Sequence, residues 1–341
     1  MNRDSISRDS RASDYHALSD YHARAHAKVN LHLGVGDARA DGYHELATVF
    51  QSLELHDDVR LALSGEEIDL STTGWEERLV ESLAVAGPYA AGVPTDAGNL
   101  VWQAAVNIAK RLRAERGVAT LPQVAFELHK GIPAAGGMAG GSADAAAALL
   151  LADAAFGPTS LGQPVLYEEA NWLGSDIAFT LRGGTALGTG RGEQLTPMLA
   201  RGTFHWAIIT SNEGLSTPAV FQKVDELRAA GKGQPPHLDT AAVSQALTSG
   251  DAEHLAAVLH NDMQPAALTL RPDLRKTLAA GKAAGALAGI VSGSGPTCAL
   301  LCADAAEAAE VAAQVSTELP GTRGIPTSGP ARGAHLVDEA N

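Results

Sequence analysis

The sequence of 341 residues has no apolar run of about 18 residues, the length that a helix needs to cross the hydrocarbon core of a bilayer. Its first two dozen residues mix Arg and Asp side chains and contain no apolar stretch, so they do not resemble a secretory signal. We therefore expect a cytoplasmic protein with no membrane partner.

Cysteine is scarce, with two residues in the whole chain. Cys298 and Cys302 stand four positions apart in one apolar run, which is neither a disulfide framework nor the spacing of a zinc site. We expect both to be buried, reduced thiols. The sequence also lacks the G-x-S-x-G, H-E-x-x-H and C-x-x-C patterns, so hydrolase and zinc-enzyme chemistry has no support.

Positive charge is in short supply: 25 Lys and Arg against 39 Asp and Glu give a net charge of −14. Such a surface repels nucleic acid, whose binding depends on neutralising phosphates, so we expect no nucleic-acid partner. A small phosphate compound would have to be held by local backbone donors and a few well-placed cations.

A strand predicted from Ala25 onward has one wholly polar face. Its apolar face is formed by Ala27, Val29, Leu31 and Leu33. The opposite face carries four nitrogen-bearing side chains, His26, Lys28, Asn30 and His32. A solvated outer face is the ordinary alternative, but such faces usually mix in Thr, Ser and Glu. The pattern therefore indicates a candidate site.

The most informative segment joins a strand predicted at 123–129 to an Ala/Leu-rich helix predicted at 143–155. Four glycines fall within positions 136–141, where backbone N–H groups can point at an anion beside the positive end of the helix dipole. The loop is neither a Walker A motif nor a dinucleotide fingerprint. A tight turn that needs glycine only for packing is the alternative. Ser142 either caps the helix or donates its hydroxyl to a phosphate or Mg²⁺.

Two shorter motifs are ambiguous on their own. Asp176 follows Gly174-Ser175 and enters an apolar run, where a helix cap and a catalytic acid are equally good interpretations. Ser292-Gly293-Ser294-Gly295 forms a second glycine-rich turn between two apolar strands.

The remaining elements alternate without strict βαβ order, which favours an α+β fold. Further strands are expected at 46–55, 58–63, 204–210, 287–292 and 297–302, and in the segment leading to Gly183. Further helices are expected at 97–113, 166–173, 217–229, 239–248, 251–260, 272–284 and 303–316. We divide the chain into a disordered extension (1–22), a first domain (23–200), a second domain (201–325) and a tail (326–341).

Three separated segments together resemble the signature motifs of the GHMP small-molecule kinases. They are Lys28 to Leu31 with Asp41-Gly42-Tyr43-His44, the loop 133–144 with Gly174-Ser175-Asp176, and the turn 292–295. The resemblance runs from about residue 23 to 320. It implies a two-domain GHMP kinase fold, in which an ATP-binding domain similar to a ribosomal-protein-S5-like unit packs on a C-terminal α+β domain, with the site in the cleft between them.

The motifs are most similar to those of family members that act on a cytidine-diphosphate-linked methylerythritol. The resemblance thus implies phosphorylation of the 2-hydroxyl of that small molecule by ATP, with Mg²⁺. Lys28 and Asp176 match the catalytic pair, and Asn30, Tyr43 and His44 match residues of the substrate site, the last two at its cytidine end. Leu187 lies near the position of an aromatic residue that stacks on cytosine in some members.

The ATP site implied by the resemblance comprises a stretch beside the adenine and the loop around the phosphates. Its residues are Asn99, Leu100, Pro133, Ala134, Ala135, Gly136, Gly137, Met138, Ala139, Gly140, Gly141, Ser142 and Ala143. Family loops commonly have glycine at the positions of Ala135 and Ala139. Because a side chain disfavours positive φ, we expect negative φ at both. No metal ligands can be assigned.

Three alternatives stay open. Another kinase of the family, acting on homoserine, mevalonate or a sugar, is disfavoured by the segment 41–44. An inactive nucleotide-binding module on the same fold is disfavoured by the retention of Lys28 and Asp176. An RNA-binding module is disfavoured by the net charge of −14. The oligomeric state is left open.

Overall fold

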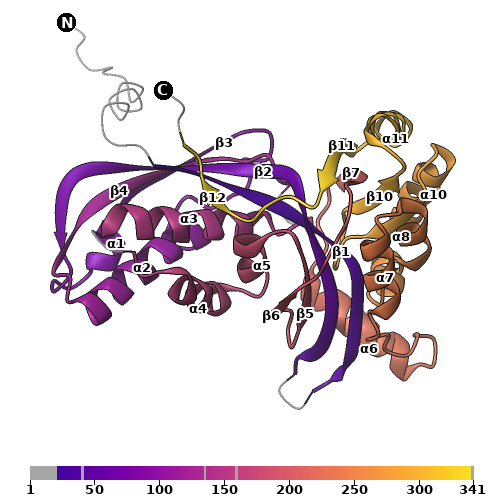
Figure 1. Cartoon of the computed structure of the whole chain (residues 1–341), viewed down its shortest axis with the longest axis horizontal. Coiled ribbons are helices and arrows are strands. Elements are labelled where there is room, and N and C mark those ends of the chain that lie inside the picture. The colour runs from indigo at the N-terminus through magenta and orange to yellow at the C-terminus, as the bar shows by residue number, and fades with distance from the viewer. Residues whose placement is uncertain (1–20, 40–41, 134–135, 158–159, 339–341) are drawn as a thin grey trace, which may run out of the picture.

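The computed structural model describes residues 21–39, 42–133, 136–157 and 160–338. Figure 1 shows two sheets with helices packed on them, and the first two strands of the larger sheet curve down beside the smaller one. The predicted extension lies outside the described residues except for Tyr21 and His22. These two residues already belong to the first strand, so ordered structure begins before the predicted boundary at residue 23.

The larger sheet has eight strands within the described ranges, in the order β12-β1-β2-β4-β3, with β5 paired to β2 and β6 and with β8 paired to β1. Their bounds are β1 (Tyr21–Ala38), β2 (His44–Asp69), β3 (Val80–Ala86), β4 (Thr120–His129), β5 (Thr185–Thr189), β6 (Gln194–Pro197), β8 (His260–Asn261) and β12 (His335–Leu336). The apolar face of β1 is buried, as its alternation predicts.

Helices α1 to α5 lie under this sheet (Figure 1). They are α1 (Trp75–Leu79), α2 (Leu100–Arg116), α3 (Gly140–Phe156), α4 (Gln163–Leu173) and α5 (Ile177–Arg182). Helix α3 is buried along most of its length and packs against β1 and β2. Its alanine side chains are short, so the helix backbone can lie close to the sheet and bring its N-terminus to the polar face of β1.

The smaller sheet is antiparallel, in the order β11-β7-β10-β9. Its strands are β7 (Phe204–Ser211), β9 (Ala288–Val291), β10 (Cys298–Cys302) and β11 (Thr322–Gly329). The accompanying helices are α6 (Thr217–Ala229), α7 (Ala241–Ser249), α8 (Ala252–Val258), α9 (Gln264–Leu270), α10 (Leu274–Ala283) and α11 (Ala305–Glu318). The α+β prediction is confirmed, because antiparallel pairing dominates both sheets.

Both cysteines lie in β10, where they are buried and form no disulfide, as expected. Burial raises the pKa of Cys298 to about 12, so the thiol stays protonated at neutral pH. None of the helices in the described part of the chain is long and apolar enough to cross a membrane.

Three local predictions are wrong. The strands expected at 46–55 and 58–63 are one continuous strand, β2, because the polar residues between them continue to pair with β1. The segment 177–182 is helix α5 rather than a strand, since a short apolar run has no period that separates the two.

The tail expected from residue 326 is ordered as far as residue 338. Strand β11 extends to Gly329, and β12 pairs with β1 at Ala23 and Arg24. These pairings join residues more than 100 positions apart, and local sequence patterns do not encode such partners. The division at residue 200 stays a prediction, although the chain passes from the larger to the smaller sheet between β6 and β7.

Candidate active site

A cavity of about 740 Å³ opens where the polar face of β1 meets both glycine-rich turns and helix α6. It is lined by Lys28, Asn30, Leu33, Gly42, Tyr43, His44, Leu46, Thr48, Phe50, Gly137, Ser142, Ser175, Asp176, Arg191, Thr217, Pro218, Phe221, Gln222, Asp225, Met263, Gly293 and Ser294. All three motif segments singled out in the sequence therefore reach one cavity.

The predicted catalytic pair comes together in this cavity. Lys28 is 4% exposed, and its Nζ lies 2.8 Å from Asn30 Oδ1 and 3.7 Å from Asp176 Oδ2. The ring of Phe50 lies 5.5 Å from the same ammonium. Asp176 precedes the first turn of α5, and its side chain is 35% exposed. A buried cation thus faces a carboxylate that remains accessible from the cavity.

The polar face of β1 divides into two parts. Lys28 and Asn30 face the cavity, whereas His26 and His32 are not among the residues that line it. The ring of His26 stacks on His335, and burial lowers the pKa of His26 to about 4, so this imidazole is neutral at pH 7. Half of the predicted polar face thus reaches the cavity, and the other half packs outside it.

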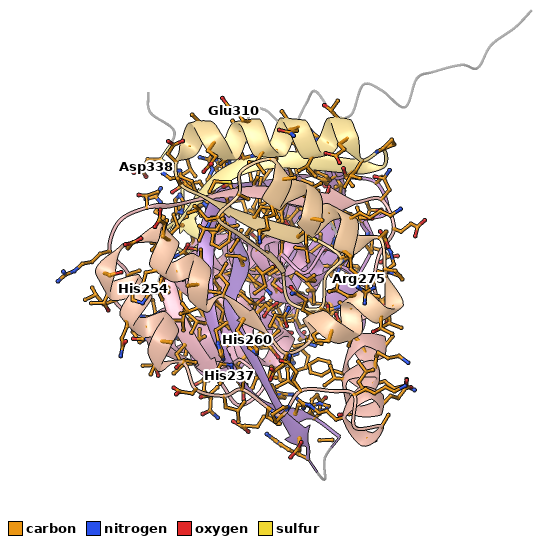
Figure 2. The ribbon with its side chains drawn as sticks, turned by 90° about the vertical axis from the view of Figure 1, so that its right-hand side faces the viewer. His237, His254, His260, Arg275, Glu310 and Asp338 are labelled. Atoms are coloured by element: carbon orange, nitrogen blue, oxygen red, sulfur yellow. The ribbon has the colours of Figure 1, made fainter. Side chains whose placement is uncertain are left out.

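His32 belongs to a cluster of histidines outside the cavity. Its ring lies 5.2 Å from that of His237 and 5.4 Å from that of His260, and Figure 2 shows His237 and His260 next to each other. Asp262 accepts hydrogen bonds from His260, from the His237 N–H and from the Val35 N–H. This cluster ties β1 to β8 and to the segment after α6.

The two glycine-rich turns lie against each other. Gly137 has φ of +74°, and a Cβ at this position would stand 2.3 Å from the carbonyl oxygen of Ser292. Ser292 Oγ donates to the carbonyl of Gly137 over 3.1 Å, and the N–H of Lys28 donates to the carbonyl of Met138 over 3.2 Å. Glycine at position 137 is required by this close approach.

The loop and the first turn of α3 contribute Gly137 and Ser142 to the cavity lining. Pro133, Gly136, Met138, Ala139, Gly140, Gly141 and Ala143 frame these two residues without lining the cavity themselves, and Ala134 and Ala135 lie outside the described residues. Asn99 caps α2 by accepting from the Val101 N–H, and its own amide donates to Pro94. A role of Asn99 and Leu100 beside adenine stays a prediction.

Ala139 contradicts the expectation of negative φ. It precedes α3 with φ of +61° and ψ of +31°, and it is the one non-glycine residue with positive φ among the residues described. Its carbonyl accepts the N–H of Ala143 and starts the helix, so the turn into α3 fixes this conformation. The left-handed region costs an L-residue about 1–2 kcal/mol.

A buried ionic network supports both ends of the glycine loop. Asp57 accepts from the N–H groups of Gly131 and Ile132 and from the Lys130 ammonium. Lys130 Nζ also reaches Asp144 Oδ2, near the N-terminal end of α3, over 2.5 Å. The three ionisable groups are at most 3% exposed. The network therefore joins β2, the start of the loop and the N-terminal end of α3.

This network holds two carboxylates against one ammonium, and Asp144 Oδ1 has no hydrogen-bond partner in the structure. Burial raises the pKa of Asp144 to about 8, assisted by the Asp57 carboxylate and opposed by Lys130. Burial alone would lower the pKa of Lys130, but the two carboxylates outweigh it and raise that pKa. Two carboxylates beside one ammonium thus favour the protonated form of Asp144.

The other end of the cavity is aromatic. Tyr43 is 53% exposed, with the Arg191 guanidinium 5.2 Å from its ring centroid. His44 is buried, its Nε2 lies 3.0 Å from Asp225 Oδ1, and its ring stacks on Phe221 at 5.0 Å. Phe221 and Asp225 come from α6, so the two halves of the chain meet at this end.

Leu187, predicted near the position of a cytosine-stacking aromatic residue, does not line the cavity. In the β2–β5 pairing, Leu187 is opposite Val49, while Gly188 is opposite Thr48. Thr48 lines the cavity and Val49 is in the main core, so alternation turns Leu187 toward the core. The aromatic residue available at this end is Phe221. An amphipathic helix gives Phe221 the same spacing as a core residue, so local sequence offered no signal for it.

The comparisons with known proteins agree with this geometry. The GHMP kinases N terminal domain matches residues 99–184, and GHMP kinases C terminal matches residues 243–321. A protein of Corynebacterium efficiens named 4-diphosphocytidyl-2-C-methyl-D-erythritol kinase is 53% identical over 259 residues, which cover 76% of this chain and 78% of the relative. One of Mycolicibacterium smegmatis with the same name is 47% identical over 275 residues, covering 80% and 78%.

Solved structures give the same result. A crystal structure of 4-(cytidine 5'-diphospho)-2C-methyl-D-erythritol kinase superposes with a TM-score of 0.68 at 28% identity, covering 91% of this chain and 100% of the other. A homoserine kinase from Cytophaga hutchinsonii reaches 0.68 at 17% identity, covering 94% and 98%, and shares the fold. The chain is thus, by class, a small-molecule kinase. More particularly, it belongs to the GHMP kinase family.

Replacing Ala139 by glycine should stabilise the protein. Glycine has no Cβ and tolerates φ of +61°, while it loses more chain entropy on folding, so we expect a net gain of about 0.5–1 kcal/mol. Urea denaturation measures this change in the free energy of unfolding. Ala143→Gly, the same change inside the first turn of α3, is the control and should destabilise. A loss of stability in Ala139→Gly would contradict the strain.

Asp144→Asn should flatten the dependence of stability on pH. Because the pKa of Asp144 is raised from 3.8 to about 8, its contribution to stability is complete below about pH 4 and is lost as pH rises toward 8. The amide cannot ionise. Between pH 6 and 8.5 we expect the Tm of the variant to decline at least about 2 °C less than that of the wild type. Parallel Tm profiles would show that Asp144 is ionised throughout.

Proposed function

We propose that this chain transfers the γ-phosphoryl group of ATP to the 2-hydroxyl of 4-diphosphocytidyl-2-C-methyl-D-erythritol, giving the 2-phosphate and ADP, in non-mevalonate isoprenoid precursor synthesis. Relatives about half identical to this chain over three quarters of its length carry this enzyme's name. The observation that supports the reaction within the structure is one cavity with the Lys28–Asp176 pair and the aromatic end.

Asp176 is the proposed general base. Its carboxylate takes the proton of the substrate hydroxyl, the oxygen attacks the γ-phosphorus, and the bond from that phosphorus to the ADP oxygen breaks. Lys28, 3.7 Å away, orients the carboxylate and offsets negative charge on the transferred group. Asn30 Oδ1 accepts a hydrogen bond from the ammonium of Lys28 and so limits the orientation of that ammonium.

The loop from Gly137 to Ser142 is the proposed phosphate cradle. It lies at the N-terminus of α3, where N–H groups and the helix dipole favour an anion. No group of three or more His, Cys, Asp or Glu side chains in the described ranges is placed to hold a metal. This fits Mg²⁺ held mainly by phosphate oxygens and water, with Ser142 or Asp176 as protein ligand, and such an ion would neutralise phosphate charge.

The aromatic end is the proposed cytidine site. Tyr43 offers an exposed ring face and Phe221 a second aromatic wall, and His44, held by Asp225, offers hydrogen-bonding groups. The Arg191 guanidinium at this end fits the negative charge of a diphosphate. The base would anchor the substrate, so that its hydroxyl meets Asp176.

Homoserine, mevalonate and sugar kinases share the fold at 10–18% identity. Similarity at this level indicates a common fold and does not indicate a common substrate. Those substrates have no base to occupy an aromatic end. ADP release measured with the cytidyl compound, homoserine and mevalonate in parallel should show turnover with the first alone. Efficient turnover of either of the other two would leave the family unchanged but overturn the proposed substrate.

Asp176→Asn should lower kcat by about 10²- to 10⁴-fold while leaving the Kd for ATP nearly unchanged, since the amide keeps the shape but cannot accept the proton. A coupled ADP-release assay and calorimetry measure the two quantities. Asp251→Asn is the matched control, because Asp251 caps α8 outside the cavity and Asn also caps well. Near-normal turnover of Asp176→Asn would reduce Asp176 to a structural role.

Phe221→Ala should raise KM for the cytidyl substrate about 5- to 150-fold, because stacking on an aromatic ring contributes about 1–3 kcal/mol per base. KM for ATP should stay within about 2-fold. The control is Trp172→Ala, which removes an aromatic side chain that is exposed and lies outside the cavity lining. Equal changes in both KM values would indicate a distorted α6 instead of a lost base contact.

A further inference from the structure

A chain of buried hydrogen bonds leads from the Lys28 ammonium into the pairing of β1 with β2. Lys28 Nζ donates to Asn30 Oδ1 over 2.8 Å, Asn30 Nδ2 donates to Thr48 Oγ1 over 2.8 Å, and Thr48 Oγ1 donates to the carbonyl of His32 over 2.9 Å. Each of the three side chains is at most 4% exposed, and that of Thr48 is completely buried. Water therefore reaches these side chains only from the cavity that they line.

The donors and acceptors of this chain have only one consistent arrangement. A carbonyl can only accept, so the single hydroxyl proton of Thr48 is committed to His32. Toward Asn30 the hydroxyl oxygen can then only accept a hydrogen bond. The group of Asn30 that faces it must therefore be the NH₂ donor. The amide oxygen of Asn30 must consequently point toward Lys28, whose ammonium has only donors.

Irregular strand pairing explains why the His32 carbonyl can accept from a side chain. The register of β1 against β2 shifts between Asn30 and His32, because Asn30 is opposite Phe50 whereas His32 is opposite Val49. A bulge locally disrupts the ladder of backbone hydrogen bonds and re-aims the neighbouring side chains. The Thr48 hydroxyl supplies a bond at this interruption.

We infer that Thr48 is a positioning residue for phosphoryl transfer: its hydroxyl fixes the amide of Asn30 and, through that amide, the ammonium of Lys28 opposite Asp176. This inference rests on the proposed function, because it assumes the catalytic roles of Lys28 and Asp176. Thr48 also lines the cavity, but the committed proton and lone pair leave its hydroxyl no donor for a substrate.

Without the hydroxyl, the amide of Asn30 can rotate and turn NH₂ toward the ammonium. Two donors then face each other in a buried site, and the ammonium moves away from its place 3.7 Å from Asp176. A misplacement of about 1 Å at a reacting group costs as much as 10²-fold in rate. The binding surfaces for ATP and for the base do not depend on this amide.

The test uses the full chain and steady-state kinetics with both substrates. Thr48→Val, which keeps the shape and removes the hydroxyl, should lower kcat about 10- to 100-fold with both KM values within about 3-fold of the wild type. Thr48→Ser, which retains the hydroxyl, should keep kcat within about 3-fold. A folded Thr48→Val with wild-type kcat would overturn the inference.

Should Thr48→Val fail to fold, the pair Thr48→Ser and Thr48→Ala carries the same comparison, because these variants differ by one hydroxyl oxygen. Equal kcat values for this pair would overturn the inference. Thr210→Val is the matched control for a buried strand threonine. The Thr210 hydroxyl donates to the carbonyl of Arg323 in the smaller sheet, so this variant should lose stability and retain kcat.

A double-mutant cycle separates positioning from general damage. In an Asn30→Ala background, Thr48→Val should lower kcat by less than about 2-fold more, since the amide through which Thr48 acts is gone. A further loss of 10-fold or more would show that Thr48 acts by another route. Normal turnover of Asp176→Asn would instead defeat the proposed function, whereas an inactive Asp176→Asn beside a normal Thr48→Val defeats only this inference.

Discussion

The close approach of two backbone turns, at Gly137 and Ser292, is the contact on which the whole site depends. No side chain fits between them, since a Cβ on Gly137 would overlap the Ser292 carbonyl. The contact joins the loop before α3 to the smaller sheet. Asn261 of β8 reinforces it by donating to the carbonyls of Val291 and Gly293, while β8 itself pairs with β1. The glycine loop, strand β1 and the second half of the chain are thereby held in one arrangement.

Electrostatics explains why this arrangement must be rigid. The proposed substrates carry phosphate charge, so a protein of net charge −14 would bind them against its own average field. The positive charges near the loop are buried and individually oriented: Lys28 by Asn30, and Lys130 by Asp57 and Asp144. The charge of Lys130 is neutralised by the carboxylates of Asp57 and Asp144, so this residue stabilises the loop. Lys28 is the buried cation that faces the cavity.

Sequence reasoning succeeded where function depends on local chain geometry. Glycine before a helix, a polar strand face and an acid after a turn each leave a pattern within ten residues, and the structure brings Lys28, Gly137 and Asp176 to one cavity. Helix α6 was predicted with its observed bounds for the same reason. Failures came from nonlocal geometry. The facing of Leu187 depends on the register of β5 against β2, and the left-handed Ala139 depends on how the loop enters α3.

Phe221 lines the aromatic end of the cavity but was not predicted as a site residue. The elements proposed to support phosphoryl transfer come from the first half of the chain: β1, the glycine loop and Asp176. Helix α6 supplies Phe221 and Asp225 from the second half. Substitutions on one face of α6 can therefore change the substrate end of the cavity without disturbing Lys28, Asp176 or the loop. The residues proposed for phosphoryl transfer are thus recognisable from local motifs, whereas the proposed substrate end includes a helix whose sequence pattern is that of ordinary packing.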